Sequence, residues 1–251
     1  MTILKLKNVS VSFGGVRAIK GVTFSMEHGE VLSIVGPNGA GKTTLFNLIS
    51  RIYDLDSGSI VFNNIELKSS PAHEIAKLGI ARTFQNTELF ENESVLNNLL
   101  IGSHVHAKTN LIHELFFLEK ARSQELDFRK KAENIIDLLD LQSYRDSKIV
   151  SLPFGIRKLV EIGRALCLKP KLVLLDEPSS GLNPEETEDL VFQIEDIKEE
   201  LAISILMIEH DMNLVSKASD RVLALADGKV LTVGKSREVQ EHPEVIKAYL
   251  G

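Results

Sequence analysis

The residues best suited to chemistry form one glycine-rich run between an apolar stretch and a segment with helical spacing. The run is Gly36-Pro37-Asn38-Gly39-Ala40-Gly41-Lys42-Thr43, followed by Thr44. Its glycines let backbone amides wrap around phosphate oxygens, Lys42 can neutralise β and γ phosphates, and the Thr43 hydroxyl can ligate Mg²⁺. Because this spacing arises by chance in roughly one chain in a hundred of this length, it predicts a site for nucleotide phosphates.

A second candidate is a pair of neighbouring carboxylates, Asp176 and Glu177, directly after the apolar run 172–175. Asp176, at the end of a buried strand, can hold the Mg²⁺ shell, and Glu177 can polarise an attacking water as a general base. Acidic residues also follow strands as helix caps, so the pair alone fits either role. The phosphate-binding run upstream favours the catalytic interpretation.

The hydrophobic pattern predicts the elements that position these residues. Residues 3–35 alternate with a period of two, and 31–35 is a continuous apolar run, both typical of strands. Further along, the pattern predicts helices at 42–52, 70–79, 157–168 and 184–201, strands at 80–84, 172–175 and 203–208, and hairpins at 59–67 and 222–233. Ser70 is expected to cap the second of these helices and Asn183 the last. This alternation is typical of a parallel sheet covered by helices.

The middle of the chain has a different pattern. From about 95 to 141 glycine is nearly absent and apolar residues recur at helical spacing, which predicts a helical subdomain. No linker or repeat separates it from its surroundings. We therefore expect one domain, with a nucleotide-binding core of about 1–85 and 157–251 and an inserted helical subdomain of about 86–156.

Composition limits the function classes. The chain has 251 residues, 43% hydrophobic and 25% charged, which is typical of a globular protein with a real core. Its net charge of −6 and lack of a basic arm argue against a nucleic-acid partner. The single cysteine, Cys167, excludes an intrachain disulfide and is expected to be a buried helical thiol. Because Met1–Lys5 lacks the pattern of a secretory signal and no apolar run approaches ~18 residues, any membrane role is expected to involve a partner.

With these motifs in this order, the chain resembles the ATP-binding subunits of ABC transporters over essentially its whole length. Five further positions match the family in order. Phe13 matches the aromatic residue that stacks on adenine, and Gln85 matches the glutamine that ligates Mg²⁺ and senses the transmembrane partner. The signature matches Leu152-Pro153-Phe154-Gly155-Ile156, the loop that crosses between two subunits matches Ser180-Gly181-Leu182-Asn183, and the γ-phosphate histidine matches His210. The resemblance implies an α/β P-loop NTPase (RecA-like) core with a parallel sheet, an N-terminal antiparallel β subdomain and an inserted α-helical subdomain.

The chain also departs from the usual family pattern. The signature is usually L-S-G-G-Q, and here Pro153, Phe154 and Ile156 replace its serine, first glycine and glutamine. The loop between subunits usually ends in aspartate, and here it ends in Asn183. These departures and the tail at 242–251 resemble the ATPases of branched-chain amino acid importers. Lipopolysaccharide-export ATPases and soluble ABC ATPases of translation or repair remain alternatives, whereas a small-molecule P-loop kinase leaves Gln85 and His210 unexplained.

The resemblance implies a subunit that binds Mg²⁺ and ATP, with Thr43, Gln85 and Asp176 on the metal and with Glu177, His210 and Gln85 in hydrolysis. It implies a second ATPase subunit facing the first, transmembrane permease subunits and an extracytoplasmic solute-binding protein, with this chain at the cytoplasmic face of the membrane. No nucleic-acid partner is expected. The cargo is chosen by the permease and the binding protein, so the importer group is an expectation from resemblance alone.

Overall fold

The computed structural model describes residues 1–83, 89–103 and 119–250. Two compact units share the chain: Met1–Gln85 together with Lys171–Gly251, and Asn86–Pro170. The second unit ends later than the boundary expected near 156, because helix α6 (Phe154–Leu166) packs against the other helices of that unit. Its helical content agrees with the pattern read from the sequence.

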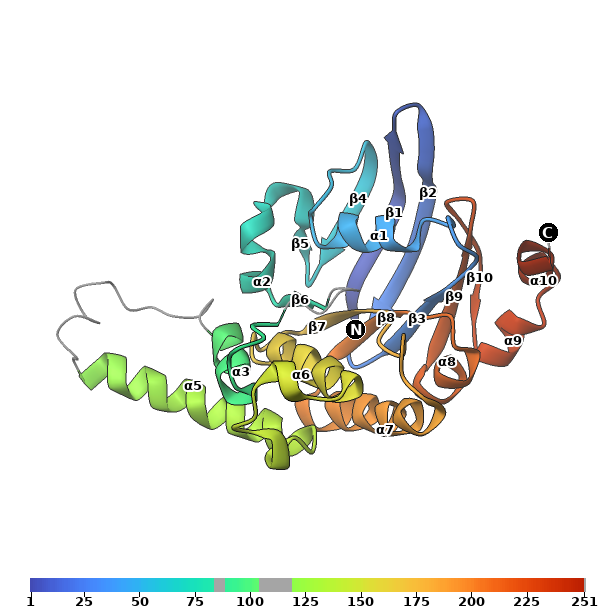
Figure 1. Ribbon diagram of the computed structural model, residues 1–251. Helices are drawn as coiled ribbons and strands as arrows, with labels where there is room; N and C mark the ends of the chain where they lie inside the picture. The colour runs from blue at the N-terminus through green and yellow to red at the C-terminus, as the bar shows by residue number, and fades with distance from the viewer. Residues whose placement is uncertain (84–88, 104–118, 251) are drawn as a thin grey trace. The chain divides into compact units, whose positions relative to one another are not determined.

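The first unit contains two sheets (Figure 1). The antiparallel sheet has the order β2-β1-β4-β5, and the second sheet has the order β10-β9-β3-β8-β7-β6. In the second sheet all neighbours are parallel except β10, which pairs antiparallel with β9. The strands are β1 (Thr2–Phe13), β2 (Val16–Glu27), β3 (Val31–Val35), β4 (Ser57–Phe62), β5 (Ile65–Glu66), β6 (Ile80–Arg82), β7 (Leu172–Asp176), β8 (Ser204–Ile208), β9 (Arg221–Ala226) and β10 (Lys229–Gly234).

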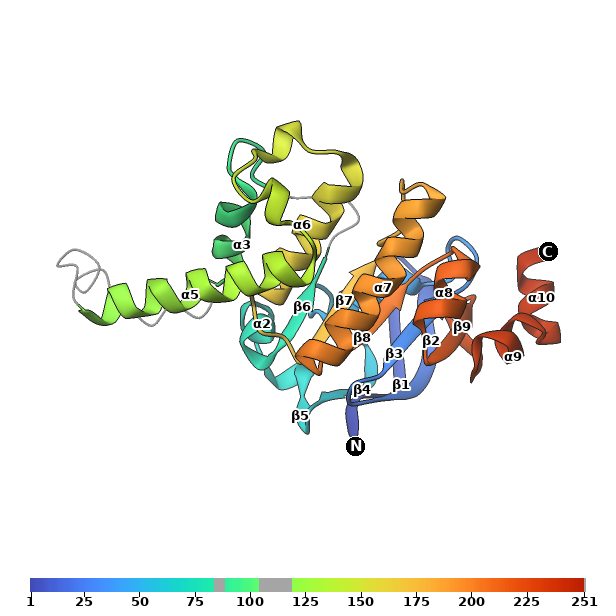
Figure 2. The same cartoon turned by 90° about the horizontal axis from the view of Figure 1, so that it is seen from below.

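The helices of the first unit cover the six-stranded sheet on both faces. They are α1 (Lys42–Ile49), α2 (Ile75–Leu78), α7 (Pro184–Leu201), α8 (Met212–Ala218), α9 (Ser236–Gln240) and α10 (Pro243–Leu250). Figure 1 shows α1 on the side of the antiparallel sheet, with α7 and α8 on the other side. Figure 2 shows α7 and α8 next to each other over that second face. Coverage of both faces explains why β3, β7 and β8 are buried at every residue.

One hydrophobic core joins the two sheets through α1. Phe46 of α1 is buried together with Leu6 of the antiparallel sheet and with Ile34 and Leu206 of the parallel sheet. A close-packed interior of this kind holds its elements in fixed register. The core therefore fixes α1, and the loop that precedes it, relative to the strand ends.

Most predicted elements are confirmed, with differences at their ends. The helix predicted at 42–52 ends at Ile49, because Arg51 has a left-handed φ of 61° that no helix continues. The expected cap at Ser70 is wrong: the segment begins with a 3₁₀ turn after Pro71, and α2 follows at Ile75. Gly79 ends α2 with φ 104°, as the glycine there predicted.

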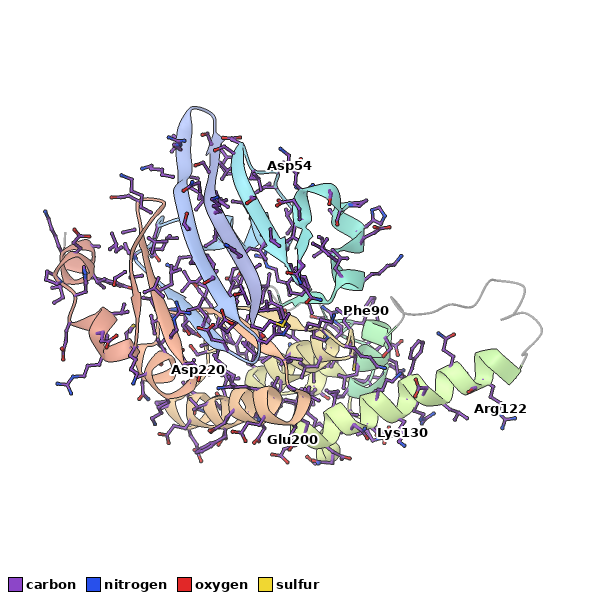
Figure 3. The ribbon with its side chains drawn as sticks, turned by 180° about the vertical axis from the view of Figure 1, so that it is seen from behind. Asp54, Phe90, Arg122, Lys130, Glu200 and Asp220 are labelled. Atoms are coloured by element: carbon purple, nitrogen blue, oxygen red, sulfur yellow. The ribbon has the colours of Figure 1, made fainter. Side chains whose placement is uncertain are left out.

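The second unit contains α3 (Val95–Ser103), α5 (Glu119–Leu138) and α6. The charged side chains of α5 labelled in Figure 3, Arg122 and Lys130, project from the helix and are exposed. Cys167 is the buried thiol that the sequence predicted, and burial raises its pKa to about 12, so it stays protonated at neutral pH. Among the described residues, no helix combines the length and apolar character needed to cross a bilayer.

Candidate functional site

Four predicted functional features of the first unit, the glycine-rich loop, Asp176, Glu177 and His210, lie at the carboxyl ends of neighbouring strands of the parallel sheet. Strands β3, β8 and β7 lie side by side, with Ile34 opposite Ile208 and Ile208 opposite Asp176. The Glu177 amide continues this pairing by donating to the Ile208 carbonyl at 2.9 Å. The carboxyl ends of parallel strands are where such folds bind ligands. The glycine-rich loop, the two carboxylates and His210 therefore follow three neighbouring strands at the same edge.

The glycine-rich loop packs too closely for side chains at two of its glycines. A Cβ on Gly36 would lie 2.0 Å from the Leu225 carbonyl oxygen, and φ is 155°. A Cβ on Gly41 would lie 2.8 Å from Ile19 Cδ1, with φ 100°. Only glycine fits both the space and the backbone conformation at these positions. The loop therefore runs tightly against β9 and β2 before it enters α1.

The N-terminus of α1 is open to an anion. Its N-cap is Gly41, which has no side chain, and its first turn is Lys42-Thr43-Thr44-Leu45, which has no acidic residue. By contrast, α7 begins with a capping box, in which Asn183 Oδ1 accepts from the Glu186 amide at 3.0 Å and Glu186 accepts from the Asn183 amide at 2.9 Å. First-turn amides and the helix dipole attract negative charge. The start of α1 thus fits a phosphate, and the cap predicted at Asn183 is confirmed.

Lys42 supplies positive charge at the centre of this loop. Its side chain is buried, and its ammonium donates to the carbonyls of Gly36 at 2.6 Å and Pro37 at 3.1 Å. Burial lowers the pKa of Lys42, whereas the carboxylates of Glu177 and Asp176 act in the opposite direction. A desolvated ammonium next to open helix amides is a favourable partner for an anion.

The two carboxylates differ in their surroundings. Asp176 is buried, and its Oδ2 accepts from Arg82 Nη2 at 2.8 Å. Glu177 is half-buried and has a left-handed φ of 50°, a conformation that costs energy for a residue with a side chain and is concentrated at functional sites. The Thr43 hydroxyl and the Asp176 carboxylate offer the oxygen ligands that Mg²⁺ prefers. Gln85, the third metal ligand expected from sequence, lies outside the described residues.

One residue, Glu209, lies between the end of β8 and His210, and the sequence did not predict its role. Glu209 is fully buried, and its carboxylate accepts three backbone amides: Ser179 at 2.8 Å, His210 at 2.8 Å and Asp211 at 3.1 Å. It thereby ties the loop after Glu177 to the backbone of His210. The available signal was an acidic residue at the end of an apolar strand, where a buried carboxylate needs several donors.

Phe13 is the last residue of β1, in the hairpin whose second strand, β2, contacts the loop. Ala18 and Ile19, near the beginning of the paired strand β2, contact the position of Gly41, so this part of the hairpin adjoins the start of α1. The Phe13 ring is 42% exposed and packs edge-on against Tyr53, with 5.0 Å between the ring centroids. An exposed ring held at its edge can stack on a flat base. Tyr53 was not predicted from the sequence.

The signature segment belongs to the second unit. Pro153 is the N-cap of α6, so the helix begins at Phe154 and not at 157 as predicted. The ring of Pro153 offers no hydrogen-bonding group, and the first turn of α6 contains no acidic residue. The N-cap side chain therefore makes no hydrogen bond to the first amides of α6, which bears on the missing serine of the usual signature.

The parallel sheet, the loop between β3 and α1 and the carboxylates at the neighbouring strand end define a P-loop nucleoside triphosphatase. A family model described as ABC transporter matches residues 19–180, and a model described as branched-chain amino acid ATP-binding cassette transporter matches residues 229–251. The chain belongs to the ABC transporter ATP-binding family and is an ATPase of that family. Its fold is the one expected from the sequence.

Individual relatives match nearly the whole chain. The high-affinity branched-chain amino acid transport ATP-binding protein BraF of Pseudomonas aeruginosa is 37% identical over 249 residues, covering 99% of this chain and 98% of BraF. LivG of Salmonella typhimurium, with the same description, is 35% identical over 252 residues at the same coverage. A solved nucleotide-free ATP-binding cassette from an ABC transporter has a TM-score of 0.86 at 33% identity, covering 100% of both chains. A dimeric cassette with ADP and phosphate bound, MJ0796, has a TM-score of 0.76 at 26% identity, covering 94% of this chain and 99% of its own.

Proposed function

We propose that this chain hydrolyses Mg²⁺-ATP as the ATP-binding subunit of an importer of branched-chain amino acids. The observation that carries the proposal is the common edge of β3, β8 and β7, where the phosphate loop, the Asp176–Glu177 pair and His210 follow adjacent strands. Family membership supports the ATPase activity, and the names of BraF and LivG support the cargo.

Different residues of this chain bind the nucleotide and take part in its hydrolysis. The loop amides and Lys42 hold the β and γ phosphates, and the exposed ring of Phe13 stacks on adenine. Glu177 accepts a proton from a water that attacks the γ-phosphorus, while the bond to the leaving oxygen of ADP breaks and inorganic phosphate forms. His210 donates to the γ-phosphate. Thr43, Gln85 and Asp176 would hold Mg²⁺, which would supply positive charge to the phosphates.

A second cassette is part of the proposal. The start of α6, at 152–156, would complete the nucleotide site of the facing subunit, and the dimeric state of the related cassette supports this arrangement. The subunits would lie at the cytoplasmic face of a membrane, bound to a permease through residues from Gln85 to about Gly102. An extracytoplasmic binding protein would deliver the amino acid.

Isolation of the complete transporter tests the proposal. A tagged chain is purified from its native membrane, its partners are identified by mass, and the complex is reconstituted in vesicles with its binding protein. We expect a permease to co-purify and ATP to drive leucine uptake, with lysine uptake as the control. Co-purification of lipopolysaccharide, with no amino acid uptake, would support the export alternative. ATPase stimulation by DNA or RNA at physiological salt, without a permease, would support the soluble alternative.

Replacing Pro153 with serine is expected to change the ATPase rate of the permease-bound complex by less than a few-fold. A serine hydroxyl that donates to a phosphate is worth roughly 1.5 to 3 kcal/mol, which would give a gain of about tenfold or more if that contact limited the rate. Because Pro153 already starts α6 with open backbone amides, we expect these amides to serve instead. Ser151→Ala, just outside the helix, is the control. A tenfold increase in turnover for Pro153→Ser contradicts this argument.

A further inference from the structure

Arg82 makes a buried ion pair with the carboxylate that is proposed to hold the metal. The side chains of Arg82 and Asp176 are 8% and 5% exposed, and Nη2 lies 2.8 Å from Oδ2. The second terminal nitrogen, Nη1, donates to Asn47 Oδ1 at 2.7 Å and to Ser50 Oγ at 3.1 Å. Arg82 therefore joins the ends of β6 and β7 to helix α1, the helix that begins at Lys42.

The guanidinium also lies against an apolar surface. Its central carbon is 5.5 Å from the centroid of the Phe46 ring, a residue of the hydrophobic core. A buried carboxylate without a positive partner is strongly destabilised. Lys42, a second cation that acts on Asp176, directs its ammonium to the carbonyls of Gly36 and Pro37. The direct charge partner of Asp176 is thus Arg82.

We propose that Arg82 is a positioning residue of the metal site, which holds the Asp176 carboxylate at a fixed place relative to α1 before Mg²⁺ and nucleotide bind. The inference rests on the proposed function in assigning Asp176 to the metal. A planar guanidinium can make these three contacts from one position, whereas a lysine ammonium on a flexible stem cannot. Arginine is therefore required for alignment as well as for charge.

The first test is a double-mutant cycle in EDTA without nucleotide, measured as thermal unfolding of the purified chain. Arg82→Met alone should lower the melting temperature by roughly 10 °C, the shift expected for a broken buried pair in a chain of this size. In an Asp176→Asn background the same change should lower it by less than half as much, because the carboxylate that needs Arg82 is gone. Equal shifts in the two backgrounds would overturn the inference, whatever Asp176 binds.

The second test measures the equilibrium affinity for a fluorescent ATP analogue, with Mg²⁺ and with EDTA, below the melting temperature of each variant. The affinity with Mg²⁺ divided by the affinity with EDTA should fall about tenfold in Arg82→Met, because the contribution of Mg²⁺ to nucleotide affinity is lost. The same ratio should fall two- to fivefold in Arg82→Lys. A ratio equal to that of the wild type in both variants would overturn the inference. Arg82→Lys keeps the test valid if the methionine variant fails to fold.

Arg221, whose side chain is 39% exposed, provides a control for the loss of an ion pair away from the site. Its Nη1 lies 3.0 Å from Oε1 of buried Glu30, near the start of β3 and β9 and therefore at the opposite edge of the sheet. Figure 3 labels Asp220, the residue before it. Arg221→Met should lower stability without changing the Mg²⁺ dependence of nucleotide affinity. If Asp176→Asn itself leaves that dependence unchanged, the metal role of Asp176 in the proposed function fails, while the cycle still measures its coupling to Arg82.

Discussion

Replacing Glu177 with glutamine is expected to slow ATP turnover by roughly 10²-fold or more. Glutamine keeps the size and polarity of the side chain but cannot accept a proton from the attacking water. Ground-state contacts to the nucleotide, from the phosphate loop and Lys42, stay in place. The variant should therefore bind ATP with nearly unchanged affinity and accumulate as an ATP-bound dimer. Single-turnover hydrolysis and ATP-dependent light scattering of the purified chain measure the two effects.

Glu185→Gln is the control for loss of one negative charge in the same region. Glu185 is exposed in the first turn of α7, after the loop that follows Glu177. This control should retain normal turnover and should dimerise only as much as the wild type. Near-normal turnover of Glu177→Gln would remove Glu177 as the general base and reopen the possibility of a different phosphoryl-transfer reaction.

Replacing Lys42 with alanine is expected to weaken ATP binding by on the order of 10²-fold. Each charge-assisted hydrogen bond to a phosphate is worth roughly 1.5 to 3 kcal/mol, and the lysine can reach both β and γ phosphates. Because burial already disfavours the ammonium in the nucleotide-free protein, its removal should change the melting temperature of that protein little. Isothermal titration with ATP measures the affinity, and thermal unfolding measures the stability.

Lys198→Ala is the control for Lys42→Ala. Lys198 donates to both carboxylate oxygens of Asp220 at 2.9 Å, in a partly exposed pair away from the phosphate loop. It should leave ATP affinity unchanged. If Lys42→Ala bound ATP as tightly as the wild type, Lys42 would have no part in phosphate binding. If Lys42→Ala unfolded without nucleotide, the contacts of Lys42 to the Gly36 and Pro37 carbonyls would be needed for the stability of the protein.

Part of the site could be predicted from the sequence because its signals are local. The loop at 36–43 is recognisable from glycines and a lysine at fixed spacing, and the strand before it from a continuous apolar run. The cap at Asn183 depends on residues three positions apart, so a short window contains the whole signal. Signals of this kind predict the chemistry of each segment without knowledge of its neighbours in space.

Other features depend on contacts between distant parts of the chain. Arg82 and Asp176 are 94 residues apart, and nothing in either segment indicates that they pair. Glu209 accepts the Ser179 amide across 30 residues. The end of the second unit at Pro170 is likewise set by packing, because α6 buries its apolar face on α3 and α5.

The class of fold, the phosphate loop, the acid pair and the resemblance to the family could all be predicted from the sequence, because periodicity and motif spacing are properties of short segments. The position of β8 between β3 and β7, which brings His210, Glu177 and the loop to one edge, depends on the tertiary structure. The pairing of Arg82 with Asp176 likewise depends on the tertiary structure. Strand order and buried charge pairing are set by the energy of the whole core, because every buried polar or charged group needs a hydrogen-bond or charge partner in the same packed structure.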